Sequence, residues 1–253
     1  MPRKARFISK SGIYHVMLRG INRQQIFKDY EDNERFLQVL NDCKEISGYK
    51  LMSYCLMENH LHLLMKEEKE KLVQIFKRIG ARYVYWYNSK YNRTGHLFQD
   101  RFRSEPVDDD RYFLTVLRYI HQNPVKAGMC KNASQYKWSS YRDYLKTRGI
   151  THTDFGLSLF HENTDKAKIL FEEFMNQEEK VDCLDIVHES AKITDKEAQR
   201  ILLEKCGLIS ITDFQSMSNE RRNCCIARLK ENNLSIRQIT RLTGVSFGIV
   251  RKV

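Results

Sequence analysis

The sequence lacks three features that would each define a class of protein. No apolar run approaches the roughly 18 uninterrupted residues that a membrane-spanning helix needs. No apolar signal-peptide core follows the basic N-terminus, and the phosphate-binding pattern G-x-x-x-x-G-K-[ST] does not occur. We therefore expect a soluble, cytoplasmic protein with no membrane partner and no nucleotide-binding loop of this type.

The cysteines form no recognisable metal or redox pattern. There are seven, an odd number, and no two have the C-x-x-C spacing of a zinc knuckle or redox site. Cys224 and Cys225 are adjacent, which is a poor geometry for a structural disulfide or a zinc clamp. We expect reduced thiols and no structural zinc site.

Charge is distributed unevenly along the chain. There are 43 Lys and Arg against 32 Asp and Glu, a net charge of +11 over 253 residues. Residues 1–150 hold 28 basic and 16 acidic residues (+12), residues 151–220 hold 7 and 15 (−8), and residues 221–253 hold 8 and 1 (+7). Two basic blocks separated by an acidic one favour two surfaces that meet a polyanion and a connector that does not. The alternative is ordinary solvated surface charge.

The apolar periodicity predicts an α+β fold. The pattern indicates a strand over 12–19, a helix over 32–47 and a hairpin of two strands over 49–57 and 61–65. A second helix over 72–87, a strand or loop over 96–107 and a third helix over 108–122 follow, and Pro124 and Gly128 end the third helix. The order β-α-β-β-α-β is that of the ferredoxin-like split βαβ arrangement, an antiparallel sheet with helices on one face. From about Gly149 onward every periodic segment is helical, so an all-α C-terminal region follows.

The hairpin contains a pair of histidines at strand spacing. His60 and His62 are two residues apart, so they point to the same face of a strand and lie about 7 Å apart. Leu61 and Leu63 then point to the core. Two imidazoles so placed can converge on one metal ion, although most such pairs are satisfied surface or core histidines.

The third helix offers a nucleophile beside a possible third ligand. Tyr119 and Asn123 are four residues apart and share a helix face. A metal held by His60, His62 and the Asn123 amide oxygen would lie beside the Tyr119 hydroxyl. A residue that precedes proline is pushed away from helical geometry, so Asn123 could sit at the C-cap, and His121 or Glu58 could replace it as a ligand.

Five motifs occur in an order that resembles a known family. They lie between about residues 8 and 145: LRGINRQ from Leu18, MENHLHLL from Met57, HLFQDRFR from His96, YIHQNPVKAG from Tyr119 and WSSY from Trp138. This combination is similar to the HUH-type single-tyrosine transposases, and within them to the REP-associated tyrosine transposases. HUH denotes two histidines flanking a hydrophobic residue, as in His60-Leu61-His62.

The resemblance implies a DNA strand-transferase or endonuclease that cuts and rejoins single-stranded or hairpin DNA. It implies Tyr119 as the nucleophile of a 5′-phosphotyrosyl intermediate, with Mg²⁺ or Mn²⁺ held by His60, His62 and Asn123. Imidazole ligands favour Mn²⁺ over Mg²⁺. By their charge and their place in matched motifs, the candidates for contacts to the DNA backbone are Arg19, Arg23, Arg101 and Arg103.

The basic C-terminal segment predicts a helix-turn-helix. Ser235 would cap its first helix, Gly244 suits the left-handed turn, and Ser246 would cap a recognition helix with Ile249 and Val250. Its candidate DNA contacts are Arg237 and Arg241; a plain helical hairpin is the alternative. The expected organisation is thus a catalytic domain over 1–148, an acidic helical connector over 149–216 and a helix-turn-helix-like tail over 217–253.

Two function classes follow. The first is a metal-dependent transposase active in DNA transposition and recombination, working as a monomer or homodimer. The second is a non-catalytic, sequence-specific nucleic-acid-binding regulator on the same fold. The presence of His60, His62, Tyr119 and Asn123 together favours the enzyme, since a regulator has no need of all four.

Overall fold

The computed structural model describes residues 6–146, 149–177, 183, 195–208, 211–232 and 234–253. The chain divides into two compact units, Met1–Asp185 and Ile186–Val253. None of the helices in the described ranges is long and apolar enough to cross a membrane. All seven cysteines carry free thiols.

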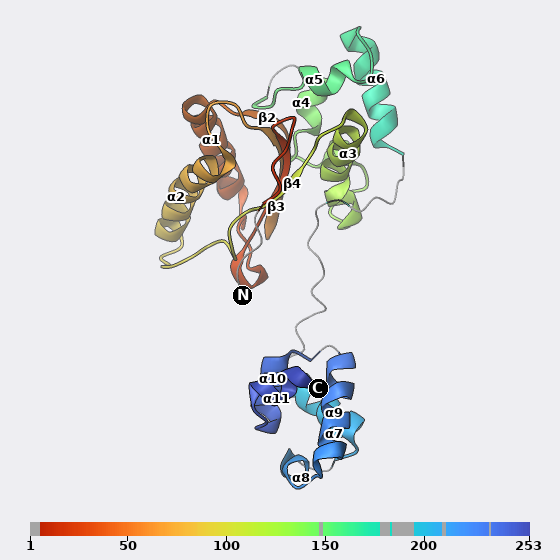
Figure 1. Cartoon of the computed structure of the whole chain (residues 1–253). Coiled ribbons are helices and arrows are strands. Elements are labelled where there is room, and N and C mark those ends of the chain that lie inside the picture. The colour runs from red at the N-terminus through yellow and green to blue at the C-terminus, as the bar shows by residue number, and fades with distance from the viewer. Residues whose placement is uncertain (1–5, 147–148, 178–182, 184–194, 209–210, 233) are drawn as a thin grey trace. The chain divides into compact units, whose positions relative to one another are not determined.

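The first unit is built on a four-stranded antiparallel sheet in the order β2-β3-β1-β4 (Figure 1). The strands are β1 (Ile13–Arg19), β2 (Lys50–Met57), β3 (His60–Lys66) and β4 (Arg103–Pro106). β1 continues into a short 3₁₀ turn, η1 (Ile21–Arg23). The strand order confirms the predicted split βαβ arrangement, and the hairpin turn shortens to Glu58 and Asn59, so that His60 is the first residue of β3.

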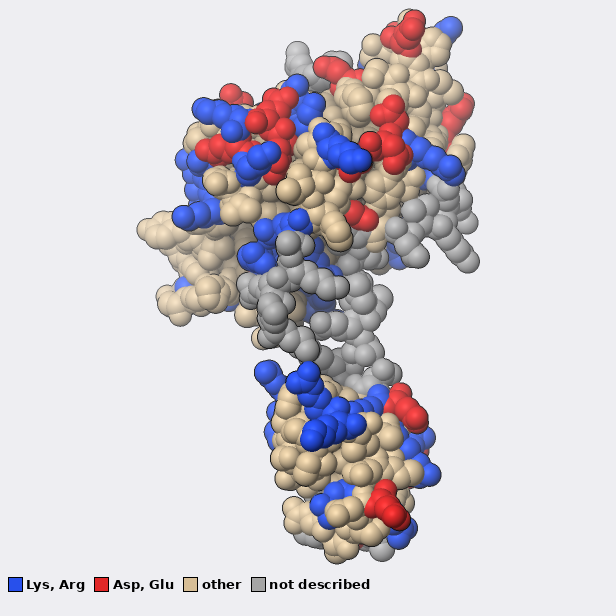
Figure 2. Space-filling model, viewed as in Figure 1, with Lys and Arg blue, Asp and Glu red and all other residues tan. Residues whose placement is uncertain are grey.

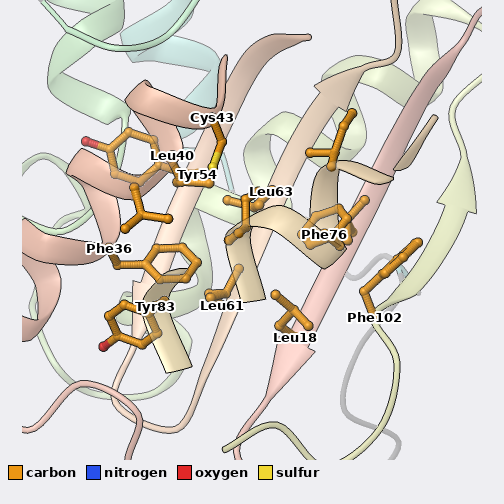
Figure 3. Close-up of a cluster of buried hydrophobic side chains, with 14 of the residues drawn as sticks. Leu18, Phe36, Leu40, Cys43, Tyr54, Leu61, Leu63, Phe76, Tyr83 and Phe102 are labelled. Atoms are coloured by element: carbon orange, nitrogen blue, oxygen red, sulfur yellow. The ribbon is translucent and has the colours of Figure 1, made fainter. Parts of the chain in front are cut away.

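Two helices pack on one face of this sheet. α1 (Tyr30–Ser47) begins at a capping box made by Asp29 and Asp32, and α2 (Leu72–Lys90) runs beside it. Side chains from both helices meet alternate residues of β1 and β3 in an apolar core; Figure 3 labels Leu18, Phe36, Leu40, Cys43, Tyr54, Leu61, Leu63, Phe76, Tyr83 and Phe102. Leu61 and Leu63 therefore point to the core, as their spacing predicts.

The remaining helices of the unit cover the opposite face (Figure 1), so helices occupy both faces rather than the one that the sequence predicts. They are α3 (Asp110–Lys126), α4 (Tyr141–Leu145), α5 (Asp154–Ser158) and α6 (Thr164–Met175), with the 3₁₀ turn η2 (Ala133–Gln135) between α3 and α4. Phe171 and Met175 of α6 are fully buried in the core that α3 forms with the sheet. The acidic segment 149–216 is thus not a single connector, because its α5 and α6 pack on the first unit.

The second unit is entirely helical in its described residues. It comprises α7 (Asp195–Cys206), α8 (Ile211–Gln215), α9 (Asn219–Glu231), α10 (Ile236–Thr243) and α11 (Phe247–Lys252). They share an apolar core of their own, to which Leu202, Phe214, Ile226, Ile239 and Val250 contribute fully buried side chains. Such a core is what an independently packed small domain requires.

Candidate active site

Tyr119 is held against the sheet by the buried stripe of α3. The helix begins after Asp109, whose side chain accepts a hydrogen bond from the Tyr112 backbone N–H at 2.8 Å. The predicted stripe of Phe113, Val116, Leu117 and Ile120 is buried. The Tyr119 ring lies 5.5 Å from the His62 ring and 5.7 Å from the His15 ring, centroid to centroid.

His60 and His62 lie on the face of β3 that α3 covers. Their ring centroids are 5.2 Å apart, with the rings nearly perpendicular. His62 is fully buried, whereas His60, at the end of the strand, is partly exposed. The period of two in the strand therefore produces the predicted convergence of both histidines beside α3.

The Nδ1 atoms of His60 and His62 have different hydrogen-bond partners. The Nδ1 of His60 lies 2.7 Å from the Asn59 Oδ1, an atom that only accepts, so this nitrogen carries the proton and the lone pair is on Nε2. The Nδ1 of His62 lies 3.0 Å from the Nε2 of His15. The Nε2 of His62 is buried and has no hydrogen-bond partner among the described residues.

Burial, followed by the neighbouring His15 and His60, lowers the pKa of His62 well below its usual value. A neutral imidazole with an unused buried nitrogen is the form that binds a metal ion. The described residues contain no group of three His, Cys, Asp or Glu side chains able to hold a metal. A cation here would therefore need a ligand of another type beside the two histidines.

Asn123, the ligand of another type that the sequence predicts, lies within α3. The helix continues through Pro124 to Lys126, so the prediction that it stops near Gln122 is wrong. Pro124 lies within the last turn, where its ring removes only one helical hydrogen bond, and Gly128, at φ +70°, follows the helix end. The Asn123 Nδ2 donates to the Tyr119 carbonyl oxygen at 3.0 Å, and the Oδ1 takes no part in this bond.

The two alternative third ligands each have other hydrogen-bond partners. His121 points away from Tyr119, because its Nε2 lies 2.9 Å from the Ser140 Oγ and 3.2 Å from the Ser53 Oγ in the core. Burial lowers the pKa of His121 to about 3. Glu58 is exposed in the hairpin turn, where it accepts a hydrogen bond from the Gln25 Nε2.

The candidate arginines of the first unit lie in three places. Arg19 of β1 is directly opposite His60 of β3. Arg103 of β4 is opposite Met17 of β1, which is itself opposite His62, so both arginines lie on the face that carries the histidines. Arg23 lies in the loop after β1 with φ +60°, and its backbone carbonyl accepts a hydrogen bond from the Asn59 Nδ2. Arg101 is different, since it lines a cavity of about 620 Å³ with Arg6, Tyr14, Leu72 and Phe102 on the α1–α2 face.

One buried polar residue of this site is absent from the sequence prediction. His15 is fully buried in β1, contacts His62 and lies 3.8 Å, through its Nδ1, from the Glu105 Oε2. The signal in the sequence is a histidine inside the otherwise apolar strand IYHVMLR. Its partners became visible only with the strand pairing.

The second unit carries the two remaining arginines on α10. The Ser235 side chain caps this helix in a capping box with Gln238, Gly244 has φ +73°, and Ser246 occupies the N-cap position of α11. Arg237 is exposed, whereas Arg241 forms an ion pair with Asp195 of α7. Figure 2 shows Lys and Arg gathered over α10 and α11 on the visible face of this unit.

Comparison with known proteins agrees with the fold of the first unit. The family model described as "Transposase IS200 like" matches residues 9–123. A protein of Haemophilus influenzae, assigned as a REP-associated tyrosine transposase, is 25% identical over 163 residues, which are 60% of this chain and 91% of that protein. The solved structure of a REP-associated tyrosine transposase bound to a REP hairpin superimposes with a TM-score of 0.50 and 16% identity, covering 60% of this chain and 92% of that one. The expected resemblance is confirmed: residues 9–123 match the IS200-like transposase family model, and the chain is similar to a REP-associated tyrosine transposase in sequence and to another in fold.

Proposed function

We propose that this protein is a metal-dependent transposase that cleaves and rejoins single-stranded or hairpin DNA through a 5′-phosphotyrosyl intermediate. The observation that carries the proposal is the contact of the Tyr119 ring with the buried His62, whose Nε2 has no hydrogen-bond partner among the described residues. The related REP-associated transposase was solved with a REP hairpin bound, which supports the same substrate class here.

The proposed chemistry is the one that the resemblance to the single-tyrosine transposases implies, with Tyr119 as the nucleophile. The Tyr119 hydroxyl oxygen attacks the scissile phosphorus, and its proton passes to solvent. The bond to the 3′ oxygen breaks, which releases a 3′-hydroxyl and leaves the 5′ phosphate on Tyr119. A 3′-hydroxyl of a second strand then attacks this phosphotyrosine, so that the strands are joined and Tyr119 is regenerated.

Two histidines and an amide fit a divalent cation. His60, His62 and Asn123 would hold it, and their imidazole content favours Mn²⁺ over Mg²⁺. When bound, the cation would polarise the scissile phosphate. Arg19 and Arg103, on the same face of the sheet, would contact the phosphates on either side of the cut.

We infer a separate role for the second unit, the binding of duplex DNA in the hairpin stem. The support is the cap–glycine–cap geometry of α10 and α11 and the exposed side chains of Arg237, Phe247 and Ile249. The catalytic domain proposed from the sequence at 1–148 then extends to the end of the first unit, since α6 completes its core.

The experiment is a covalent-adduct assay with Mn²⁺ and hairpin-containing single strands whose flanks vary in sequence. Because Tyr119 would retain the 5′ phosphate, only strands labelled at the 3′ end should migrate with the protein on a denaturing gel. Tyr119→Phe should reduce the adduct and the cleavage to background, while strand affinity and folding persist. Tyr112→Phe on the same helix is the matched control and should still form the adduct. Hairpin binding by the wild-type protein without any adduct would support the regulator instead.

A further inference from the structure

His15 and His62 form a buried pair that needs a defined arrangement of protons. Both side chains are fully buried, and the His15 Nε2 lies 3.0 Å from the His62 Nδ1. A hydrogen bond between two imidazole nitrogens requires one to donate and the other to accept. The orientation of this bond therefore decides which nitrogen of His62 has a free lone pair.

Only one orientation suits a metal ligand. If the Nδ1 of His62 donates to His15, the lone pair of His62 is on Nε2, the nitrogen that has no hydrogen-bond partner in the described part of the chain. If His15 donates instead, neutral His62 carries its proton on that same Nε2, where a buried N–H without an acceptor costs about 1–3 kcal/mol. The first orientation leaves that Nε2 as a lone pair and moves the other proton of the pair to the Nδ1 of His15, where Glu105 is the nearest charged group that the structure shows.

Glu105 favours the first orientation from the other side of His15. His15 is directly opposite Glu105 in the β1–β4 pairing, and its Nδ1 lies 3.8 Å from a Glu105 carboxylate oxygen. The negative charge attracts the proton of His15 to Nδ1, which leaves the His15 Nε2 as an acceptor. For His60, Asn59 provides the equivalent acceptor directly.

Resting on the function proposed above, we propose that His15, oriented by Glu105, is a positioning residue that fixes His62 as the Nδ1–H tautomer and presents its Nε2 to the metal ion. Acceptors behind ligating histidines typically contribute 10- to 100-fold to metal affinity. His15 contacts neither DNA nor the metal in this arrangement. Its contribution should depend on its acceptor nitrogen rather than on its volume.

The test separates the acceptor from the volume in the full-length protein. His15→Gln places a carbonyl oxygen near the position of Nε2, whereas His15→Leu fills the space without an acceptor. Mn²⁺ affinity is measured by titration calorimetry, with thermal unfolding as a check of the fold. We expect His15→Leu to weaken Mn²⁺ binding by about 10- to 100-fold, and His15→Gln to stay within a few-fold of the wild type. Glu105→Gln should weaken binding less than His15→Leu.

A second measurement needs no substitution. Long-range ¹H–¹⁵N correlation spectra of the wild-type protein distinguish the two histidine tautomers, and the His62 ring should carry its proton on Nδ1. A His62 that carries it on Nε2 would overturn the proposal, even if every His15 variant failed to fold. Unchanged Mn²⁺ affinity in folded His15→Leu would overturn the role of His15 alone. A wild-type protein that binds no Mn²⁺ would overturn the metal site and this role together, whereas adduct formation by Tyr119 is scored separately.

Discussion

Both faces of the sheet are covered by helices, but the α3 face differs from the α1–α2 face in holding a pair of buried histidines in contact with each other. On the α1–α2 face, the tyrosine hydroxyls are paired with backbone carbonyls: Tyr49 donates to Leu40 and Tyr83 to Ile26, each at 2.6 Å. On the α3 face, histidines contact one another and Tyr119, and the Nε2 of His62 has no hydrogen-bond partner in the described ranges. The α3 face thus buries a ring nitrogen whose hydrogen-bonding capacity the described residues do not use.

The alternation of side chains along a strand makes this division possible. In β3, Leu61 and Leu63 enter the apolar core, while His60 and His62 face α3. If the proposed function holds, neighbouring residues of one strand serve stability and chemistry separately. Substitutions one or three residues apart should therefore affect different measurements.

The largest expected effect is on the α3 face. His60→Ala removes a partly exposed imidazole, so cleavage with Mn²⁺ should fall to background while the midpoint of thermal unfolding changes little. A chelator should likewise stop wild-type cleavage without unfolding the protein. Cleavage is followed with a labelled strand, and unfolding by circular dichroism.

Leu63→Ala is the matched control on the other face. Leu63 is fully buried, so its truncation should reduce the free energy of unfolding by about 2–5 kcal/mol. At a temperature where the variant is folded, its Mn²⁺ affinity should stay within about two-fold of the wild type. A large loss of stability in His60→Ala, or a loss of Mn²⁺ binding in Leu63→Ala, would end the distinction between the faces.

A smaller effect should distinguish arginines on the two faces. Arg19 is opposite His60, whereas Arg101 lines the cavity on the α1–α2 face. Arg19→Gln should weaken single-strand binding by about 3- to 10-fold and lower the salt dependence by about 0.7 in the log–log slope, the value of one phosphate contact on a single strand. Arg101→Gln makes the same change of charge and should have less effect. Equal losses in a salt series would show that the strand contacts both faces.

The sequence was sufficient for the features that depend on local spacing. The β-α-β-β-α-β order, the convergence of His60 with His62 and the buried stripe of α3 all follow from periods of two or about 3.6 residues. Tyr119 lies beside His62 because α3 covers the face that the histidines occupy. That helices occupy both faces of the sheet could not be read from the period of α3, since a stripe shows which side is buried but not against what.

Three other features depend on contacts between distant residues. The role of His15 requires the register of β1 with both β3 and β4, which brings His62 and Glu105 to the same ring. The segment around α6 is acidic, so its composition does not predict that Phe171 and Met175 are fully buried against the first unit. Pro124 locally favours a helix end, but α3 continues through it to Lys126. The packing of α3 outweighs this preference, because in the last turn the proline ring removes only one helical hydrogen bond.

The smallest effect tests whether duplex binding belongs to the second unit rather than to either face of the sheet. Arg237 is exposed on α10 and makes no ion pair in the described residues, so Arg237→Gln should weaken binding to a duplex stem several-fold and lower its salt slope by about 0.9, one phosphate contact on duplex DNA. Arg200→Gln on α7 removes the same charge from a residue already paired with Glu197, and it serves as the control.

Affinity for duplex, hairpin and single strand is measured over a salt series for the full-length protein. Adduct formation on single strands should be the same in both variants, because Tyr119 lies in the other unit. If Arg237→Gln leaves duplex affinity unchanged, Arg237 does not contact the stem, and the proposed role of α10 in duplex binding is wrong.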